Sequence, residues 1–472
     1  MVPAPLLITH KSEAEVMAFL AKHLPNRKSE KDKFGEVFTP ASLVNSVYDQ
    51  ITQYSPAIWQ NPETTLLDPS AGVGNFTALA YFRFMEGLKT KIPSVQKRSK
   101  HIIENIIFMV ELNPENCRVL RRLFGSKANI ICTSFLDEGH RQVNTAVVKR
   151  FLSKRAGFSM IVGNPPYQQE RPESKGTNAG RKTLWDRFVV ASLGILAPDG
   201  YLGFITPAGW RGTGRTSYLW KILTQKQILY LRIYSQQDGH RLFNATTRFD
   251  VYMVRNSPNT QPTNVVDQKG EEHRLKLEEW PFLPNYMLPF FHSIIVPVDE
   301  GIKVLYGTHH HTQKSSMKSN HSPVHSHKVV HNINQAGLGY WYAKDALRGH
   351  FGAPKVILNF NQKQYNFPEQ NDFKGNLGMS QLSFGIPIQS KEEGERVLRA
   401  VGTPLFQELI KASKWGAFQT DYRMFSHFTP KIWDMINRSA RPDRRATKRR
   451  GSRKGMRTSK RTRKAQRPDD SQ

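Results

Sequence analysis

The stretch Asp68-Pro69-Ser70-Ala71-Gly72-Val73-Gly74-Asn75-Phe76 follows an apolar run typical of a strand and opens a helical pattern. Glycines in such a turn let the backbone approach a ligand closely, and the helix N-terminus offers free N–H groups. The turn is not GxGxxG, and no Lys-Ser/Thr pair follows it, so a dinucleotide fingerprint and a phosphate loop both fit poorly. The sequence therefore indicates a site for a nucleotide-like cofactor, with a plain turn as the alternative.

Seven short apolar runs, rich in β-branched residues, recur along the first 255 residues with helical patterns between them. Strands that alternate with helices predict an α/β fold with a mostly parallel, doubly wound sheet. The runs are TLLD (65–68), IIFMVEL (106–112), NIICTSF (129–135), FSMIVG (158–163), YLGFIT (201–206), ILYLRIY (228–234) and RFDVYMV (248–254). The helical patterns cover 41–51, 75–88, 113–124 and 183–196.

Local signals mark where several of these elements begin. Thr39-Pro40 predicts an N-cap followed by proline at the first helical position. Pro198-Asp199-Gly200 predicts a turn just before the fifth strand. Further along, Ser390 with Glu393 predicts a capping box, and Thr403-Pro404 repeats the N-cap and proline signature.

The pattern changes after residue 255, which predicts a second, mixed α+β domain. Proline and aromatic residues come first, followed by a polar, histidine-rich segment near 307–333 and then by the two helix starts. We therefore expect a helical lead-in over 1–32, an α/β domain over 33–255, a mixed domain over 256–437 and a basic tail over 438–472. The segment from Trp280 to Phe291 offers aromatic side chains either for a recognition surface or for the core, namely Trp280, Phe282, Tyr286 and Phe290.

Charge points to a polyanionic partner. The chain has 68 Lys and Arg against 39 Asp and Glu, a formal net charge of +29, which favours nucleic acid. The tail contains 15 Lys or Arg and 3 Asp, so we expect it to be disordered and to contact phosphates or carry a nuclear address. A merely solubilising terminus is the alternative. Candidate tail contacts to DNA are Arg445, Lys448, Arg449 and Arg450.

The numbers and positions of cysteines, apolar runs and histidines argue against a disulfide-rich, a membrane-spanning and a metal-binding protein. Cys117 and Cys132 are too few for a disulfide framework or a thiolate zinc site, which favours a reducing compartment. The first residues do not resemble a signal peptide, and no run of about 18 apolar residues occurs, so we expect a soluble, intracellular protein with no membrane partner. Seven of the 16 histidines lie between 309 and 331. This segment is typical of a polar loop, with zinc binding as the alternative, and no metal is expected.

Two carboxylates at predicted strand ends suit a particular cofactor. Asp68 lies at the tip of the first strand, where a carboxylate pairs well with an ammonium. Asp68 and its turn would fit the amino-acid part of S-adenosylmethionine. Glu111 ends the next strand and can accept two hydrogen bonds from ribose hydroxyls.

Asn164-Pro165-Pro166-Tyr167 follows the fourth strand, at the carboxyl end where open α/β sheets bind their ligands. The prolines stiffen the turn, the Asn164 amide and Pro165 carbonyl can accept from an amino group, and Tyr167 offers a stacking surface. A base swung out of a duplex would satisfy all three. A simple proline turn is the alternative.

With these residues, the chain resembles the adenine-specific, amino-group DNA methyltransferases of the γ arrangement, in which a target-recognition domain follows the catalytic domain. FGEVFTP (34–40) is similar to the family's leading element, DPSAGVGNF to its first cofactor motif, Glu111 to its ribose acid and NPPY to its catalytic motif. TLWDRFVVASLGIL and GYLGFITPAGW also resemble the segments that follow. The resemblance covers 33 to about 255, and beyond that only the KVILNF and SQLSFGIPIQS pattern.

The resemblance implies a seven-stranded S-adenosylmethionine-dependent methyltransferase fold and a set of site residues. Catalytic residues are Asn164, Pro165, Pro166 and Tyr167. Cofactor-binding residues are Phe38, Thr39, Pro40, Asp68, Ser70, Ala71, Gly72, Gly74, Glu111, Ser134, Phe135, Asp137 and Asn164. Ser134 departs from the pattern, because the family usually has an acid there to contact the cofactor's adenine. Ser134 or Asp137 can hydrogen-bond that group instead, and Phe135 can stack on it.

The implied reaction is direct in-line transfer of a methyl group from S-adenosylmethionine to the exocyclic amino nitrogen of a flipped-out adenine in double-stranded DNA. No covalent nucleophile is needed, and neither cysteine lies in a Pro-Cys turn, which argues against a cytosine carbon-5 enzyme. The alternatives are a catalytically weak or inactive DNA-binding protein of this fold, an RNA adenine methyltransferase and a protein glutamine methylator.

Partners and compartment follow from the same resemblance. We expect a monomer with no built-in nuclease, because few residues precede the first motif and no acidic nuclease cluster is evident. A cognate restriction endonuclease is left open. The resemblance suits the cytoplasm or nucleoid of a prokaryotic or virus-infected cell, and the basic tail keeps the nucleus as an alternative.

Overall fold

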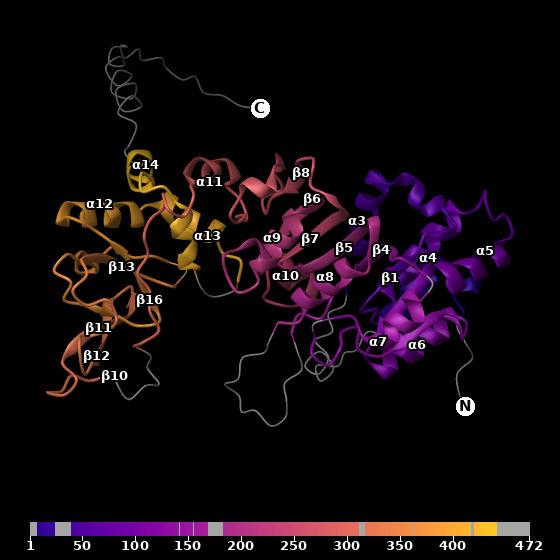
Figure 1. The fold of residues 1–472 in the computed structure, drawn as a ribbon, viewed down its shortest axis with the longest axis horizontal. Helices are drawn as coiled ribbons and strands as arrows, with labels where there is room; N and C mark the ends of the chain where they lie inside the picture. The colour runs from indigo at the N-terminus through magenta and orange to yellow at the C-terminus, as the bar shows by residue number, and fades with distance from the viewer. Residues whose placement is uncertain are drawn as a thin grey trace, which may run out of the picture.

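The computed structural model describes residues 7–23, 39–140, 142–153, 155–168, 183–310, 317–361, 363–416 and 420–440. These residues form an α/β part and a C-terminal mixed part, which lie next to each other along the longest axis of the molecule (Figure 1). The predicted basic tail lies almost entirely outside the described residues. No described helix is both long and apolar enough to cross a membrane.

The α/β part is built on one large sheet. Among the described residues it has nine strands in the order β3-β2-β1-β4-β5-β7-β6-β8-β9. The strands are β1 Leu66–Asp68, β2 Ile107–Glu111, β3 Asn129–Cys132, β4 Phe158–Gly163, β5 Leu196–Pro207, β6 Lys226–Tyr234, β7 Phe249–Pro258, β8 Thr263–Val266 and β9 Glu272–Leu275. The first five strands pair in parallel, and β7 is antiparallel to both β5 and β6. The predicted α/β class with a mostly parallel sheet is thus confirmed, and all seven predicted strands are present.

Helices cover both faces of this sheet. They are α1 Glu13–Lys22, α3 Ala41–Tyr54, α4 Asn75–Gly87, α5 Val95–His101, α6 Pro114–Phe124, α7 Thr145–Val147, α8 Trp185–Gly194, α9 Tyr218–Thr224 and α10 Gln236–Phe243. Successive residues of β1 separate the two sides, because side chains of a strand alternate between faces. Leu66 packs into one core cluster with α3 and α4, whereas Leu67 packs into the other with α8 and α9.

The C-terminal part contains two small sheets and a helical group. Its strands are β10 Met317–Lys318, β11 His327–Asn334, β12 Gly337–Ala343, β13 Lys355–Asn359, β14 Asn371–Asp372, β15 Gly378–Met379 and β16 Ser383–Pro387. Its helices are α11 Leu288–Ile294, α12 Lys391–Val401, α13 Pro404–Ala412 and α14 Ile432–Ser439. The core is continuous with that of the α/β part, since Phe282, Phe384 and Phe406 belong to the same cluster as Leu67. The two parts therefore share apolar packing.

Several expected boundaries differ from the structure. The large sheet crosses residue 255, because β7 runs to Pro258 and β8 pairs in parallel with β6. The expected turn at Pro198-Asp199-Gly200 lies inside β5, as an irregularity in its pairing with β4. The Thr403 side chain accepts from Phe406 N as predicted. Only half of the predicted capping box is present, because the Ser390 side chain accepts from Glu393 N but the Glu393 carboxylate accepts from Gln389 N.

The histidine-rich segment was expected to be a loop to about residue 333, but β11 starts at His327. Its Val329, Val330 and Ile333 are fully buried, and β11 pairs with β12 along its length. Apolar burial explains the strand despite the polar neighbours. His311 lies outside the described residues.

Candidate active site

The loops that follow β1 to β5 meet at one edge of the sheet, because carboxyl ends of parallel strands share an edge. The glycine turn follows β1, and its Gly72 and Gly74 have φ values of +55° and +104°. A Cβ at Gly74 would lie 2.8 Å from Leu120 Cδ2, so both conformation and packing require glycine there. At Gly72 a Cβ would meet no atom within 4 Å. The turn is open beside Gly72 and closed beside Gly74.

The two carboxylates predicted for the cofactor flank this turn. Asp68 is 1% exposed, and its Oδ1 accepts from Ser70 N at 3.0 Å. Burial, with Glu111 nearby, raises the pKa of Asp68 to about 8. The Glu111 carboxylate accepts from Gly72 N at 2.7 Å and from Asn113 N at 2.7 Å. Glu111 therefore ties the end of β2 to the glycine turn.

Asn164 forms a hydrogen bond with Thr39, which the sequence predicted to be a helix cap. Thr39 was expected to cap the helix, but Pro40 is the N-cap of α3 and no side chain caps it. The Thr39 hydroxyl instead accepts from Asn164 Nδ2 at 3.1 Å, and Thr39 O accepts from Asn75 Nδ2 at 2.9 Å. Thr39 thus joins the NPPY motif to the helix that follows the glycine turn.

The hydroxyl group of Tyr167 is buried inside the protein. Its ring packs against the core, its hydroxyl oxygen is buried, and burial with nearby Asp250 and Tyr252 raises its pKa. Asp250 is fully buried and pairs with Arg211, whose Nε and Nη2 donate to its two oxygens at 2.7 and 2.9 Å. The phenol is therefore neutral. Arg211, which pairs with Asp250, also donates to Leu283 O and so links this region to the C-terminal part.

Four buried polar atoms at this edge receive no hydrogen bond from the described residues: Ser70 Oγ, Asn75 Oδ1, Asn164 Oδ1 and the Tyr167 hydroxyl. Buried polar atoms are normally paired, and each exception asks for an explanation. All four belong to the glycine turn or to the NPPY motif. An arrangement of this kind suits a ligand with amino or hydroxyl donors.

Ser134, Phe135 and Asp137, which follow β3 and were predicted to bind the cofactor, each make a different contact. The Ser134 hydroxyl donates to Leu136 O at 2.8 Å, so its oxygen is left to accept, which suits an amino group. Asp137 turns back to accept from Gln142 N at 3.2 Å. Phe135 is 1% exposed and packs on Phe188 with ring centroids 5.3 Å apart, so its ring offers no accessible face in this structure.

The aromatic residues considered for DNA contact lie mainly in the core. Trp280, Phe282 and Tyr286 are buried, and Phe290 packs against the same cluster. Phe282 contacts Trp415 with ring centroids 5.4 Å apart, and the Tyr286 hydroxyl donates to Glu408 at 3.0 Å. Core packing, the alternative to recognition, therefore describes them, because proline turns fold this segment against the sheet. Phe38, Arg445, Lys448, Arg449 and Arg450 lie outside the described residues.

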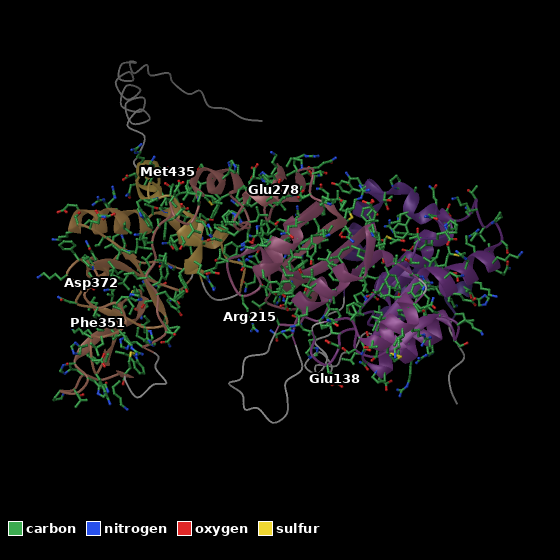
Figure 2. The ribbon with its side chains drawn as sticks, in the orientation of Figure 1. Glu138, Arg215, Glu278, Phe351, Asp372 and Met435 are labelled. Atoms are coloured by element: carbon green, nitrogen blue, oxygen red, sulfur yellow. A yellow bond between two sulfur atoms is a disulfide. The ribbon has the colours of Figure 1, made fainter. Side chains whose placement is uncertain are left out.

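A cleft between the two parts contains residues that sequence reasoning missed. It measures about 480 Å³ and is bounded by the loop after β5 and by the C-terminal part. Figure 2 labels Arg215 near this junction. Arg215 is exposed and forms no ion pair with any described residue. The glycines and arginines of GWRGTGR (209–215) were the available signal in the sequence. Its polar and aromatic lining includes Arg215, Thr216, Tyr306, Gln381, Trp415 and Tyr422.

The two cysteines differ from expectation. Cys117 of α6 and Cys132 at the end of β3 are joined as a disulfide, although neither was expected to pair. The fold brings them together because α6 connects β2 to its neighbour β3. They lie beside the Glu111 end of β2, outside the NPPY motif.

Sequence comparison identifies relatives of the α/β part. Residues 79–239 match the family described as Eco57I restriction-modification methylase. A protein of Mycoplasma pneumoniae (strain ATCC 29342 / M129 / Subtype 1), named an uncharacterized adenine-specific methylase, is 24% identical over 246 residues. That alignment covers 39% of this chain and 57% of the relative, so the chain spans little more than half of that protein's length.

Solved structures extend the likeness of fold to most of the chain. The ATP-dependent Type ISP restriction-modification enzyme LlaBIII bound to DNA matches with a TM-score of 0.50 and 11% identity, covering 90% of this chain and 41% of the other. A DrdV-DNA complex matches equally, with 58% of its chain covered. Through residues 79–239 the chain is similar to the Eco57I restriction-modification methylases, and its predicted resemblance to the adenine-specific DNA methyltransferases is confirmed.

Proposed function

We propose that the chain is an S-adenosylmethionine-dependent DNA methyltransferase that methylates the exocyclic amino nitrogen of a flipped-out adenine. The observation that carries the proposal is the Asn164 amide. Its Nδ2 donates to Thr39 Oγ1, which fixes the rotamer, while its buried Oδ1 receives no bond from the described residues. A fixed, unpaired acceptor at the end of β4 is what an exocyclic amine requires.

The residues around the glycine turn fit the cofactor. Ser70 Oγ and Asn75 Oδ1 receive no hydrogen bond from the described residues, Asp68 can pair with an ammonium, and the Glu111 carboxylate is of the type that accepts from ribose hydroxyls. S-adenosylmethionine, when bound, supplies an electrophilic methyl group on its sulfonium. The open space beside Gly72 admits a ligand against the backbone. No covalent nucleophile of the protein is required.

In this proposal the chain contributes mainly by positioning. The Asn164 amide and the Pro165 carbonyl accept from the target amine as positive charge develops on nitrogen, and Tyr167 supports the flipped base. Packing of the Tyr167 ring against the apolar core keeps that ring in place. These groups need no change of protonation state near neutral pH.

Double-stranded DNA is the proposed substrate. The net charge of +29 favours a nucleic acid, and the two neighbours that share the fold over most of the chain are, by their titles, complexes with DNA. Arg215 beside the cleft between the two parts is positioned to meet a phosphate. Ser134, which stands where the resembled family usually has an acid, supports the second candidate, a weak or inactive DNA-binding protein.

Methyl transfer from labelled S-adenosylmethionine to unmethylated plasmid DNA tests the proposal, with single-stranded RNA as comparator and mass spectrometry of the released nucleosides. We expect N(6)-methyladenine in the DNA. Label confined to RNA would contradict the DNA substrate. Absence of transfer, with salt-sensitive DNA binding retained, would favour the inactive DNA-binding protein.

A further inference from the structure

The hairpin that ends the large sheet places three metal-ligating side chains together. Strands β8 and β9 are antiparallel, with Val265 opposite His273, and the turn between them contains Gly270 at φ +91°. Asp267 lies two residues past Val265, and side chains alternate along a strand, so Asp267 and His273 share a face. Glu271 belongs to the same turn.

Asp267 is fully buried and only half satisfied. Its Oδ1 accepts from Lys269 N at 2.7 Å and from Glu271 N at 3.0 Å. Its Oδ2 receives no hydrogen bond from any described residue, and the same holds for the buried His273 Nε2. These two atoms lie 3.8 Å apart, which is too long for a hydrogen bond. A buried carboxylate oxygen without a partner is costly.

The spacing suits an ion between these atoms. One ligand atom each from Asp267, Glu271 and His273 lies within 4.8 Å of the other two. Bonds of about 2.0–2.2 Å from one ion to nitrogen and carboxylate oxygen place such ligand atoms about 3–4 Å apart. One imidazole with two carboxylates favours a first-row transition metal over Ca²⁺ or Mg²⁺, which take oxygen ligands. Glu271 is exposed, so water can complete the coordination.

We propose that Asp267, Glu271 and His273 bind a divalent transition-metal ion, of which Zn²⁺ is the representative. The site follows the carboxyl end of β8, four strands along the sheet from β4 and its NPPY motif, and it does not depend on the proposed methyl transfer. Figure 1 shows β8 next to β6 in the large sheet. Glu278, labelled in Figure 2, marks the chain just past β9.

The metal's role would be structural, because the turn contacts the segment that joins the two parts. Gln268 N donates to Asn285 O at 2.8 Å, and Lys269 Nζ lies 4.6 Å from the centroid of the Tyr286 ring. Asn285 in turn accepts from Arg211 at 3.0 Å. An ion that fixes this turn would also fix the junction.

Titration of the chelator-treated full chain with Co²⁺, followed by its visible absorption bands and by Zn²⁺ competition, tests the site. We expect His273→Ala and Asp267→Asn to weaken binding at least tenfold. His309→Ala and His321→Ala are the matched controls, because both histidines are exposed in the histidine-rich segment, and they should leave these bands unchanged. Wild-type affinity in the hairpin variants, or loss of the bands only in the controls, would overturn the proposal.

Glu271→Gln distinguishes loss of a metal ligand from loss of folding, because this exposed side chain can be changed without disturbing the core. It should also weaken Co²⁺ binding while leaving the circular dichroism spectrum unchanged. Zn²⁺ should raise the midpoint of thermal unfolding of the wild type and much less that of Glu271→Gln. Equal shifts in both proteins would likewise reject the site.

Discussion

Two buried polar side chains of this molecule, Arg211 and Asn164, contrast in how completely the described residues satisfy them. At the domain junction, Arg211 is fully buried and donates five hydrogen bonds, two to Asp250 and the others to Leu283, Pro284 and Asn285. At the NPPY edge, Asn164 and the glycine turn keep buried oxygen atoms that no described residue satisfies.

The fully paired side chain stabilises the fold, whereas the unpaired acceptors are suited to bind a ligand. A fully paired network lowers the free energy of the folded chain relative to any partly broken one, so it holds the two parts together. An edge with unpaired acceptors carries an energetic cost that a ligand can relieve.

Asn164→Ala should have the largest effect on activity. Removing the unpaired acceptor should lower the rate of methyl transfer about 10²–10³-fold, with the fold intact, measured with labelled S-adenosylmethionine on plasmid DNA. Thr39→Val removes only the group that holds Asn164 Nδ2 and should cost less, about tenfold. If Asn164→Ala transfers methyl at the wild-type rate, the assignment of the NPPY edge is wrong.

Arg211→Met should have the largest effect on stability. Breaking a buried ion pair leaves Asp250 charged and unpaired, which costs about 3–5 kcal/mol of unfolding free energy, measured by urea denaturation. Arg241→Met is the matched control, because its pair with Asp238 lies on the surface and should cost below about 1 kcal/mol. Similar losses in the two variants would contradict the junction's role. Arg211→Met/Asp250→Leu should recover part of the stability.

Asp68 should make cofactor binding depend on pH. Because burial raises its pKa to about 8 in the free protein, an ammonium must displace a proton below that pH, so affinity should rise from pH 6 to pH 8 by up to about tenfold per unit. Calorimetry in buffers of different ionisation enthalpy should detect the released proton. Proton release unchanged in Asp68→Asn would contradict this role.

The same carboxyl should lower the stability of the free chain as pH rises. Burial raises the folded pKa of Asp68 to about 8, above the ordinary value of 3.8 for an aspartate, so its contribution is most favourable below about pH 4 and is lost as the pH rises toward 8. Asp68→Asn should therefore stabilise the free protein at pH 7, by roughly 2–4 kcal/mol. Thermal unfolding at pH 5 and pH 7 would test it, and a variant less stable than wild type at pH 7 would refute it.

Arg215→Gln should have the smallest effect. If Arg215 meets a DNA phosphate, its loss should reduce the salt slope of binding by about one unit, equally for all sequences. Arg118→Gln, an exposed arginine on α6 that pairs with Glu115, is the control. Phe282→Ala should instead lower stability, since Phe282 is a core residue, and leave the salt slope unchanged. The reverse pattern would restore the recognition surface predicted at Phe282.

Local sequence signals were sufficient for the sheet and its turns. Each predicted strand from β1 to β7 is present, since short apolar runs and glycine turns depend on neighbours along the chain. The glycine turn and NPPY were found in the same way. Two further strands of the sheet escaped notice, because β8 and β9 are short and largely polar and acquire their pairing from the edge of β6.

Contacts between distant segments were decided only by the tertiary structure. The bond from Asn164 to Thr39, the five bonds of Arg211, the Cys117–Cys132 disulfide and the cluster around Asp267 each join residues whose partners depend on the packing of strands and helices. Trp280 and Phe282 show the same limit, because an aromatic residue's pattern does not distinguish a core from an exposed recognition surface. The sequence by itself determined most strands and helices and the positions of the two motifs along the chain. The three-dimensional fold decided which polar groups are hydrogen-bonded within the protein and which are left to bind a ligand.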